Sequence, residues 1–334
     1  MSSHGNKGNP VVDDETFMEM FEAMGTSQMS RQLGIAERAI YSRRRRLEAE
    51  YNVQLFPPRQ GFQAIEPERT ARREYEVEDG SVIVFSDAHY WPQTIPTIHA
   101  AIVDVAKKIK PKMIVANGDI FDGARMSRHA RIGWESTPEP HEEVWACQAR
   151  LAEIEAAAPK ATKVWTLGNH DARFETYVAN NAPEMAKVHG VHLRDHFPAW
   201  ETAWSAWING EVCIKHRWHG GIHAAWNNVL KSGVTFVSGH THQMNIRPFN
   251  DYNGTRYGIE CGTASEPNGP QYMAYTEDNP KNWISGAMVL SFRRGILMDP
   301  EPIRRIDHGL YSFRGDLHEV SLEEKKTRKK RAKK

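Results

Sequence analysis

Three short apolar runs, separated by longer stretches of mixed polarity, constrain the fold of this chain more than any other feature. The runs are Ser81–Phe85, Met113–Ala116 and Lys163–Leu167, and each resembles a buried strand. The stretches between them, Ile95–Ile109 and His141–Ala158, are predicted to be helices. Strand–helix–strand units of about 30 residues join parallel strands through right-handed crossovers. We therefore expect an α/β domain with a parallel sheet.

The pattern changes to hairpins after His196. The segment Trp204–His216 is interrupted by Asn209-Gly210, a strong signal for a tight turn between antiparallel strands. Arg256–Cys261 and Ala287–Leu297 are predicted to be further strands. The domain therefore adds antiparallel strands to its parallel part and extends over residues 80–315.

Residues of the types that bind metals gather in five short clusters, and four of these clusters directly follow a predicted strand. The clusters are Asp87-Ala88-His89, Gly118-Asp119 with Asp122, Gly168-Asn169-His170-Asp171, His216, which ends a hairpin strand, and Gly239-His240-Thr241-His242. Ligand sites gather at the carboxyl ends of parallel strands, so the clusters are expected to converge. Within an extended segment, residues i and i+2 point the same way and can reach one ion.

The donor set in these clusters is carboxylate, imidazole and amide oxygen, with no thiolate. This chemistry argues against a structural cysteine-type zinc site and favours a hydrolytic site for Mn, Fe, Zn or similar ions. Two such ions about 4 Å apart can clamp both the attacking and the leaving oxygen of a phosphoryl group. The sequence therefore indicates a two-metal hydrolase.

The order of the clusters resembles the calcineurin-like metallophosphoesterase superfamily, whose pattern is D-x-H, GD-x-x-D, GNH-[DE], a lone His after a strand, and GH-x-H. The resemblance extends from Ser81 to the C-terminal strands. It implies a two-sheet, mixed β-sandwich core flanked by helices. It also implies two divalent metal ions, with Mn²⁺ preferred over Fe, Zn, Ni or Mg, and hydrolysis of a phosphate ester by attack of a metal-bound hydroxide.

The resemblance also implies a role for each residue. The first metal would be held by Asp87, His89 and His242, the second by Asn169, His216 and His240, and Asp119 would bridge both. His170 would not bind metal but would lie beside the phosphate and protonate the leaving oxygen. Asp171 could fix the tautomer of His170, and Arg173 could hold a carboxylate or the substrate phosphate.

One ligand position has two candidates. His216 directly ends its strand, whereas His219 is followed by the glycine that the family pattern favours. We prefer His216, and His219 could instead contact the substrate. Asp122 is interpreted as a structural residue that packs or caps the loop after Asp119.

Residues 13–52 are predicted to form a separate all-α module that resembles a helix-turn-helix. A helix through Phe17 and Met24 ends at Gly25, a short segment follows, and a helix from Ala36 to Tyr51 comes after Gly34. This last helix carries basic side chains that could contact DNA, namely Arg38, Arg43, Arg44, Arg45 and Arg46. The alternative is a small helical bundle for self-association.

The remaining segments carry little core. Residues 53–79 are rich in proline and charge and are interpreted as a linker, and residues 316–334 as a basic, disordered tail. The net charge is +1, so attraction to nucleic acid depends on local patches. Three cysteines without metal-type spacing favour a reducing compartment, and no apolar run is long enough to span a membrane. We therefore expect a cytoplasmic protein, whose oligomeric state the sequence does not indicate.

Three functions fit these features. The first is a nuclease or phosphodiesterase acting on DNA, since the N-terminal module suggests nucleic acid as the substrate. The second is a small-molecule phosphatase or nucleotide phosphodiesterase, which needs only the same site. The third is a DNA-binding factor with a vestigial hydrolase domain, and the complete set of ligands argues against it.

Overall fold

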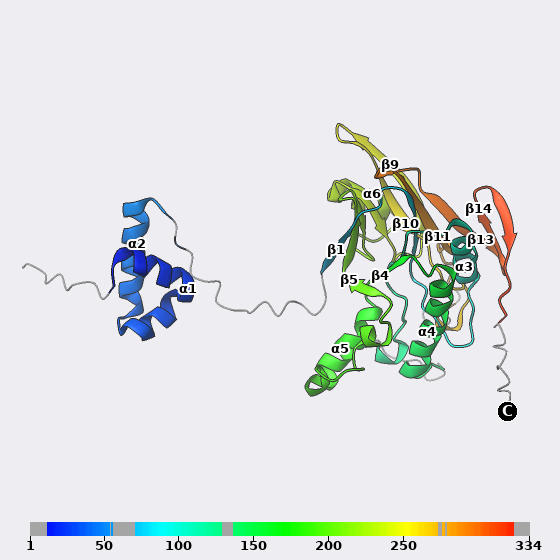
Figure 1. Ribbon diagram of the computed structural model, residues 1–334. Coiled ribbons are helices and arrows are strands. Elements are labelled where there is room, and N and C mark those ends of the chain that lie inside the picture. The colour runs from blue at the N-terminus through cyan, green and yellow to red at the C-terminus, as the bar shows by residue number, and fades with distance from the viewer. Residues whose placement is uncertain are drawn as a thin grey trace, which may run out of the picture. The chain divides into compact units, whose positions relative to one another are not determined.

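The computed structural model describes residues 12–53, 55, 71–128, 136–272, 276–277 and 279–323. The chain divides into two compact units, Met1–Glu68 and Arg69–Lys334 (Figure 1). Much of the predicted linker, residues 54 and 56–70, and most of the predicted tail, residues 324–334, lie outside the described residues.

The N-terminal unit contains two helices, α1 (Asp14–Leu33) and α2 (Glu37–Tyr51). The Asp13 side chain caps α1 by accepting a hydrogen bond from the Thr16 amide at 2.8 Å. Gly25, with φ 69°, kinks α1 where the sequence predicted its end, so the unit has three helical segments. Their apolar faces enclose a small core of Phe17, Phe21, Met29, Ile40, Leu47 and Leu55.

The second unit is built from two β-sheets. The larger sheet has the order β15-β14-β13-β11-β2-β3-β4-β5, with β12 paired to β11. Its strands are β2 (Gly80–Phe85), β3 (Met113–Ala116), β4 (Thr162–Thr166), β5 (Glu201–Ala203), β11 (Gly286–Arg293), β12 (Ile296–Leu297), β13 (Glu301–Asp307), β14 (Leu310–Phe313) and β15 (Asp316–Glu319). Strands β2 to β5 are parallel. The strand–helix–strand spacing predicts this for β2, β3 and β4, and β5 is a further parallel strand that the sequence did not indicate.

The smaller sheet has the order β1-β6-β7-β8-β10-β9. Its strands are β1 (Arg72–Tyr75), β6 (Ser205–Ile208), β7 (Val212–Ile214), β8 (Thr235–Ser238), β9 (Met244–Asp251) and β10 (Gly254–Cys261). The predicted hairpin at Asn209-Gly210 joins β6 to β7. Strands β7, β8 and β10 are parallel neighbours, so the carboxyl ends of β7 and β8 lie at one edge.

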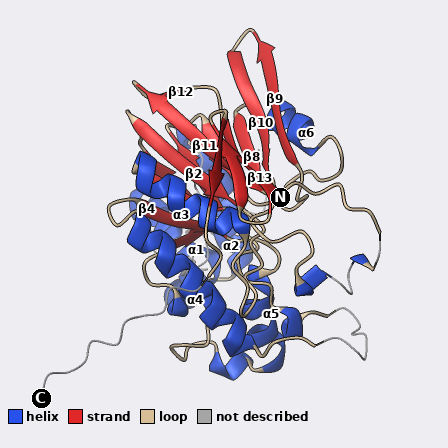
Figure 2. Cartoon of the chain, turned by 90° about the vertical axis from the view of Figure 1, so that its right-hand side faces the viewer, coloured by secondary structure: helices blue, strands red, loops and turns tan. Residues whose placement is uncertain are grey.

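Strand β2 shows how the layers form. Its side chains alternate, so that Val82 and Val84 join the core between the two sheets, while Ile83 and Phe85 join the core under the helices. Helices α3 (Thr97–Ile109) and α4 (Pro140–Ala157) cover that outer face, and α6 (Ala224–Ser232) packs on the smaller sheet beside β9 and β10 (Figure 2). The remaining helical segments are α5 (Asp171–Asn181) and the 3₁₀ turns Ala124–Met126, Pro183–Met185, Leu193–His196 and Pro270–Tyr272.

These layers confirm the predicted α/β, two-sheet core flanked by helices. Long-range pairing turns two short charged segments into edge strands. β1 lies within the predicted linker and pairs with β6, and β15 lies within the predicted tail and pairs with β14. In the part of the chain that the structure describes, no helix is long and apolar enough to cross a membrane.

Candidate metal centre

The loops that follow the parallel strands place all seven predicted ligands at one edge of the two sheets. Asp87 and His89 follow β2, Asp119 follows β3, and Asn169 follows β4. These three strands are adjacent and in register, with Phe85 opposite Ala116 and Ala116 opposite Trp165. His216 follows β7, while His240 and His242 follow its parallel neighbour β8.

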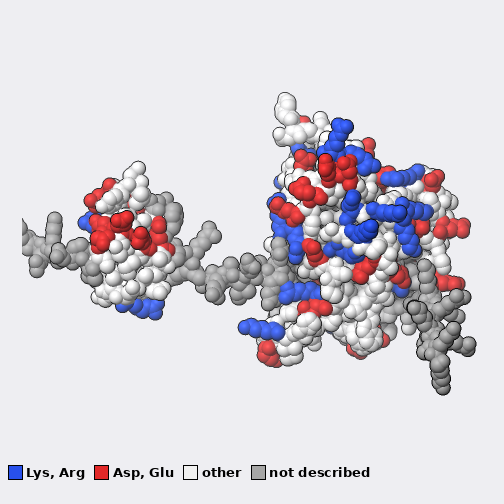
Figure 3. All heavy atoms as spheres, in the orientation of Figure 1, with Lys and Arg blue, Asp and Glu red and all other residues white. Residues whose placement is uncertain are grey.

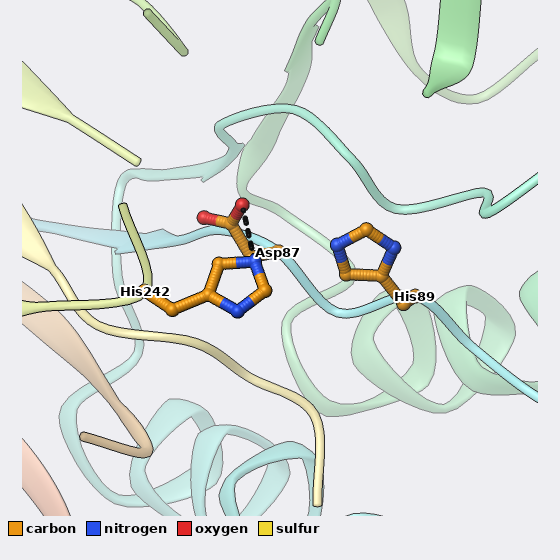
Figure 4. Close-up of side chains that lie close together, drawn as sticks. All are labelled: Asp87, His89 and His242. Atoms are coloured by element: carbon orange, nitrogen blue, oxygen red, sulfur yellow. Dashed lines mark ion pairs between the residues drawn. The ribbon is translucent and has the colours of Figure 1, made fainter. Parts of the chain in front are cut away.

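Three overlapping groups of potential ligand atoms form at this edge. Two of them consist of predicted ligands only, and the third joins His89 and Asp119 to His170. Asp87, His89 and His242 bring one ligand atom each to within 4.8 Å of one another, and Figure 4 shows the carboxylate and the two imidazole rings close together. Asp119, His216 and His240 form a second group by the same criterion. The first group contains the residues implied for the first metal, and the second contains two of the three residues implied for the second metal, His216 and His240, together with Asp119, the residue implied to bridge both.

Unpartnered buried atoms test whether the residues fit a metal. Four buried polar atoms of the predicted ligands have no hydrogen-bond partner among the described residues: His89 Nε2, Asn169 Oδ1, His216 Nε2 and His242 Nδ1. A buried polar atom without a partner costs about 1–3 kcal/mol. His216 Nε2 does lie 3.0 Å from Asp119 Oδ2, but the pair lacks hydrogen-bond geometry. Coordination of cations would satisfy His89 Nε2, Asn169 Oδ1 and His216 Nε2, whereas His242 presents its other ring nitrogen, Nε2, to Asp87 at 3.2 Å. The residues therefore fit the metals.

Two of the imidazoles are held by their other ring nitrogen. His89 Nδ1 lies 2.8 Å from Asp122 Oδ1, and His216 Nδ1 lies 2.8 Å from the Asn117 carbonyl oxygen. Such contacts fix the tautomer and direct Nε2 toward the metal. The sequence suggested that Asp122 only packs or caps its loop, but its carboxylate also holds the His89 ring. Its spacing, three residues after Asp119, was the available signal.

The backbone is strained at most of the predicted ligands. Non-glycine residues rarely adopt positive φ, which costs roughly 1–2 kcal/mol per residue. Five of the seven predicted ligands adopt it: Asp87 (53°), His89 (39°), Asp119 (52°), His240 (71°) and His242 (56°). Strain of this kind persists only where the surrounding structure imposes it, and it gathers at functional sites.

Close packing around the ligands accounts for two glycines of the clusters. A Cβ atom on Gly168 would lie 2.1 Å from Asp119 Oδ1, and one on Gly118 would lie 2.4 Å from the His216 ring. Glycine is therefore required before Asn169 and before Asp119, because any side chain there would displace a ligand of the second group.

The carboxylates create a strongly negative field in the site. Burial acts to lower the pKa of His216, but Asp119 and Asp87 outweigh it and raise the pKa to about 10. Burial acts to raise the pKa of Asp87, but the neighbouring His242 and His216 outweigh it and lower the pKa to about 2. A field that attracts protons to a buried imidazole also attracts metal cations.

His170 lies beside both groups. Its backbone amide donates to Asp119 Oδ1 at 2.7 Å, and its ring packs edge-on against His89 with centroids 4.6 Å apart. Its Nδ1 lies 3.0 Å from Asp122 Oδ1, and Arg173 Nη2 lies 3.2 Å from its Nε2. Arg173 also donates to the Asp122 carbonyl at 3.0 Å, so it braces His170.

Asp171 does not fix the tautomer of His170, contrary to our expectation. Its carboxylate accepts hydrogen bonds at 2.8–3.1 Å from the backbone amides of Asp119, Ile120, Phe121 and Gly168 and from the Trp165 indole. Five donors therefore occupy it, and it anchors the loop that carries Asp119. The contact to the His170 ring comes instead from Asp122.

The structure places His216 and His219 differently. His216 is buried against Asp119. The hydrogen bonds of His219 instead run from its backbone to the Asn228 side chain, at 3.0 Å from the amide and 3.4 Å from the carbonyl, and its ring packs against Trp218. His219 Nε2 is also buried without a partner. No group of potential ligands among the described residues includes His219.

The predicted DNA-binding arginines of α2 are not equivalent. Arg43 and Arg46 pair with Asp14 at 2.6 and 3.0 Å, and Arg44 pairs with Glu48 at 2.9 Å. Arg38 and Arg45 are exposed, and no ion pair among the described residues involves them. Figure 3 shows acidic side chains gathered on the visible face of this unit and basic ones as a separate, smaller group.

Comparison with solved structures finds several chains that are similar to this one. Vps29 from Entamoeba histolytica, solved with Zn²⁺, shares 11% identity at a TM-score of 0.35, covering 72% of this chain and 98% of that one. An archaeal phosphodiesterase shares 16% identity at a TM-score of 0.36, covering 67% of this chain and 99% of that one. A dimetal phosphatase from Danio rerio shares 11% identity at a TM-score of 0.35, covering 74% of this chain and 100% of that one.

Comparison of the sequence itself gives the family. No curated protein matches it. The model of the calcineurin-like phosphoesterase family matches residues 80–256, more than half of the chain, and this range contains all seven predicted ligands. The chain therefore belongs to the calcineurin-like phosphoesterase family.

Proposed function

We propose that this protein is a two-metal phosphodiesterase that cleaves DNA. The observation that carries the hydrolytic part is the pair of ligand groups at one edge of the sheets, with buried donor atoms that have no protein partner. Two divalent ions bound there would polarise the phosphoryl group and lower the pKa of a water nucleophile. Mn²⁺ is our preferred ion, as the family resemblance implies; the carboxylate and amide oxygens suit it, and the imidazoles would also suit Zn, Fe or Ni.

The chain's own residues have separate tasks in this proposal. Asp119 would hold both ions; this is supported by its position in the group with His216 and His240 and in the group with His89 and His170. His170 lies beside both groups and would deliver a proton to the leaving oxygen. Arg173 keeps that ring in place from one side and Asp122 from the other.

Nucleic acid is the proposed substrate because of the N-terminal unit. Three helical segments with glycine turns and an exposed arginine face are typical of modules whose last helix enters the major groove. Arg38 and Arg45 of α2 are exposed and would contact phosphates. The unit would bind DNA, and the metal centre would cleave the phosphodiester whatever the base sequence of the DNA.

A second candidate is a phosphatase or nucleotide phosphodiesterase for small substrates. It is favoured by the internal pairing of Arg43, Arg44 and Arg46, which leaves fewer arginines for DNA than the sequence suggested. The same metal site would serve both functions, so the substrate must be tested directly.

The deciding experiment is an activity assay of the full-length protein with Mn²⁺. The substrates are plasmid DNA, single-stranded DNA, bis-p-nitrophenyl phosphate and p-nitrophenyl phosphate. We expect cleavage of DNA and of the diester, and we expect Asp119→Asn and His170→Ala to abolish it. Cleavage of the monoester alone would contradict the diesterase proposal and support the second candidate.

The role of the N-terminal unit needs a separate test. The double variant Arg38→Ala/Arg45→Ala should bind DNA more weakly and show a smaller salt dependence, while cleavage of bis-p-nitrophenyl phosphate stays unchanged. The control Lys160→Ala/Lys187→Ala removes the same charge from exposed positions of the second unit. Equal effects of both variants on DNA binding would show that net charge, and not α2, attracts DNA.

A further inference from the structure

An aromatic pair lies directly against the first ligand group. The rings of Tyr272 and Trp283 pack edge-on with centroids 4.8 Å apart. The Trp283 ring lies 4.4 Å from that of His242, and the Tyr272 ring lies 5.8 Å from His242 and 5.7 Å from His89. Two aromatic side chains therefore form a wall beside the metal ligands.

Tyr272 is the fixed, inner member of this wall. Its ring is buried, and its hydroxyl lies 2.7 Å from Ser265 Oγ. Ser265 Oγ lies 2.6 Å from Thr263 Oγ1, which in turn donates to the Asp87 carbonyl at 2.7 Å. A chain of hydroxyls thus joins the wall to the backbone of a metal ligand.

Trp283 is the outer member, and its position is also set by the backbone. The amide of Ile284 donates to the His242 carbonyl at 2.9 Å, which places the preceding residue beside that imidazole. Trp283 remains partly exposed, unlike Tyr272. The Lys281 ammonium lies 5.4 Å from the centroid of the Trp283 ring and 5.9 Å from that of Tyr272.

Orientation of His242 alone does not account for Trp283. Asp87 Oδ1 already lies 3.2 Å from His242 Nε2, and buried Tyr272 already packs against the same ring. A partly exposed indole with a lysine over it, beside a phosphate-binding site, has the features of a stacking platform for a nucleobase. The cation would attract the phosphate attached to that base.

We infer that Trp283 and Lys281 form a subsite for the nucleoside of the scissile ester. This inference rests on the proposed function and narrows it. The enzyme would prefer phosphodiesters whose phosphate carries a nucleoside on the His242 side. Trp283 would supply a stacking face, Lys281 a charge, and the metal ligands would contribute no base recognition.

The test compares the binding of a nucleotide with the binding of inorganic phosphate to the Mn²⁺-loaded, full-length protein. Isothermal titration calorimetry measures the binding of dTMP and of inorganic phosphate to wild type, Trp283→Ala and Trp283→Phe. We expect Trp283→Ala to weaken dTMP binding about tenfold to a hundredfold, as removal of a stacking aromatic does. Phosphate binding and Mn²⁺ content should not change, and Trp283→Phe should retain most of the dTMP affinity.

Kinetics give a second readout. Trp283→Ala should raise KM for thymidine 5′-p-nitrophenyl phosphate by a similar factor, while kcat, and both constants for methyl p-nitrophenyl phosphate, stay unchanged. Lys281→Gln should weaken dTMP binding mainly at low salt, because a partly exposed charge is screened at high salt. Trp226→Ala, which removes a half-exposed indole that contacts Phe249 on the smaller sheet, is the matched control and should behave as wild type.

The outcomes separate this inference from the proposed function. Equal loss of dTMP and phosphate binding in Trp283→Ala, or loss of Mn²⁺, would show that the indole only supports His242 and would overturn the subsite. Unchanged dTMP binding would also overturn it, even if the wild type cleaves diesters. Trp283-dependent dTMP binding by a protein that cleaves no diester would support the subsite and refute the phosphodiesterase.

Discussion

Replacement of His216 by alanine tests the assignment of the second ligand group. His216 is 1% exposed, its Nδ1 lies 2.8 Å from the Asn117 carbonyl, and its unpartnered Nε2 lies beside Asp119. Loss of a residue that merely supports a ligand weakens metal binding about 10–100-fold, and loss of a ligand should exceed that. We therefore expect affinity for the second ion to fall at least about 100-fold, or roughly 2.7 kcal/mol.

The same change should also destabilise the protein without metal. Alanine removes one of the two hydrogen bonds that the buried Asn117 carbonyl accepts, while the bond from Ser86 Oγ at 2.8 Å remains, and such a bond contributes about 0.5–1.5 kcal/mol. The metal measurement is therefore made only after circular dichroism shows a folded variant. The assay is Mn²⁺ content by mass spectrometry after dialysis at a fixed low Mn²⁺ concentration, together with hydrolysis of bis-p-nitrophenyl phosphate.

His219→Ala is the matched control. The backbone groups of His219 make its contacts to Asn228, and alanine keeps them. We expect two bound ions in this variant and only one in His216→Ala. The opposite result, with two ions in His216→Ala and one in His219→Ala, would refute the assignment of His216 and the reasoning from its orientation.

Three further predictions follow from the packing and protonation of the site and core. Gly168→Ala should lower Mn²⁺ content, because its Cβ would lie 2.1 Å from Asp119 Oδ1. The control Gly220→Ala, whose Cβ would meet nothing within 4 Å, should keep its Mn²⁺, and equal Mn²⁺ content in the two variants would contradict the steric argument. Burial lowers the pKa of His99 despite its hydrogen bond to Glu153, so the unfolded chain takes up a proton first as the pH falls. The contribution of His99 to the free energy of unfolding should therefore be fully present above about pH 6.5. Below that pH the free energy of unfolding should decrease by up to about 1.4 kcal/mol per pH unit, and urea titrations should find a smaller slope in His99→Gln. Removal of metal by chelation should lower Tm and abolish the Mn²⁺ dependence of Tm, because ions that bind only the folded state stabilise it by mass action; an unchanged Tm would argue against a filled site.

The arginines of α2 show where sequence reasoning stopped. Their clustering at positions 43–46 was visible, and so was the basic character of the helix. Which of them are free was not visible, because Asp14, which pairs with Arg43 and Arg46, comes from another helix. Side-chain pairing across a fold depends on packing angles that local pattern does not contain.

The sequence by itself determined the parallel pairing of the strand–helix–strand part, the order of the candidate ligand residues, and the family to which they point. These features are local, since a strand and the loop after it carry their own signal. Tertiary structure alone decided that Asp122 and not Asp171 contacts the His170 ring, that His216 and not His219 faces Asp119, and that Trp283 lies against His242. Each of these contacts joins segments beside different strands. Pairing of β3 with β4 in the larger sheet brings Asp122 to His170, and the packing of the two sheets brings the other two pairs within a few ångströms.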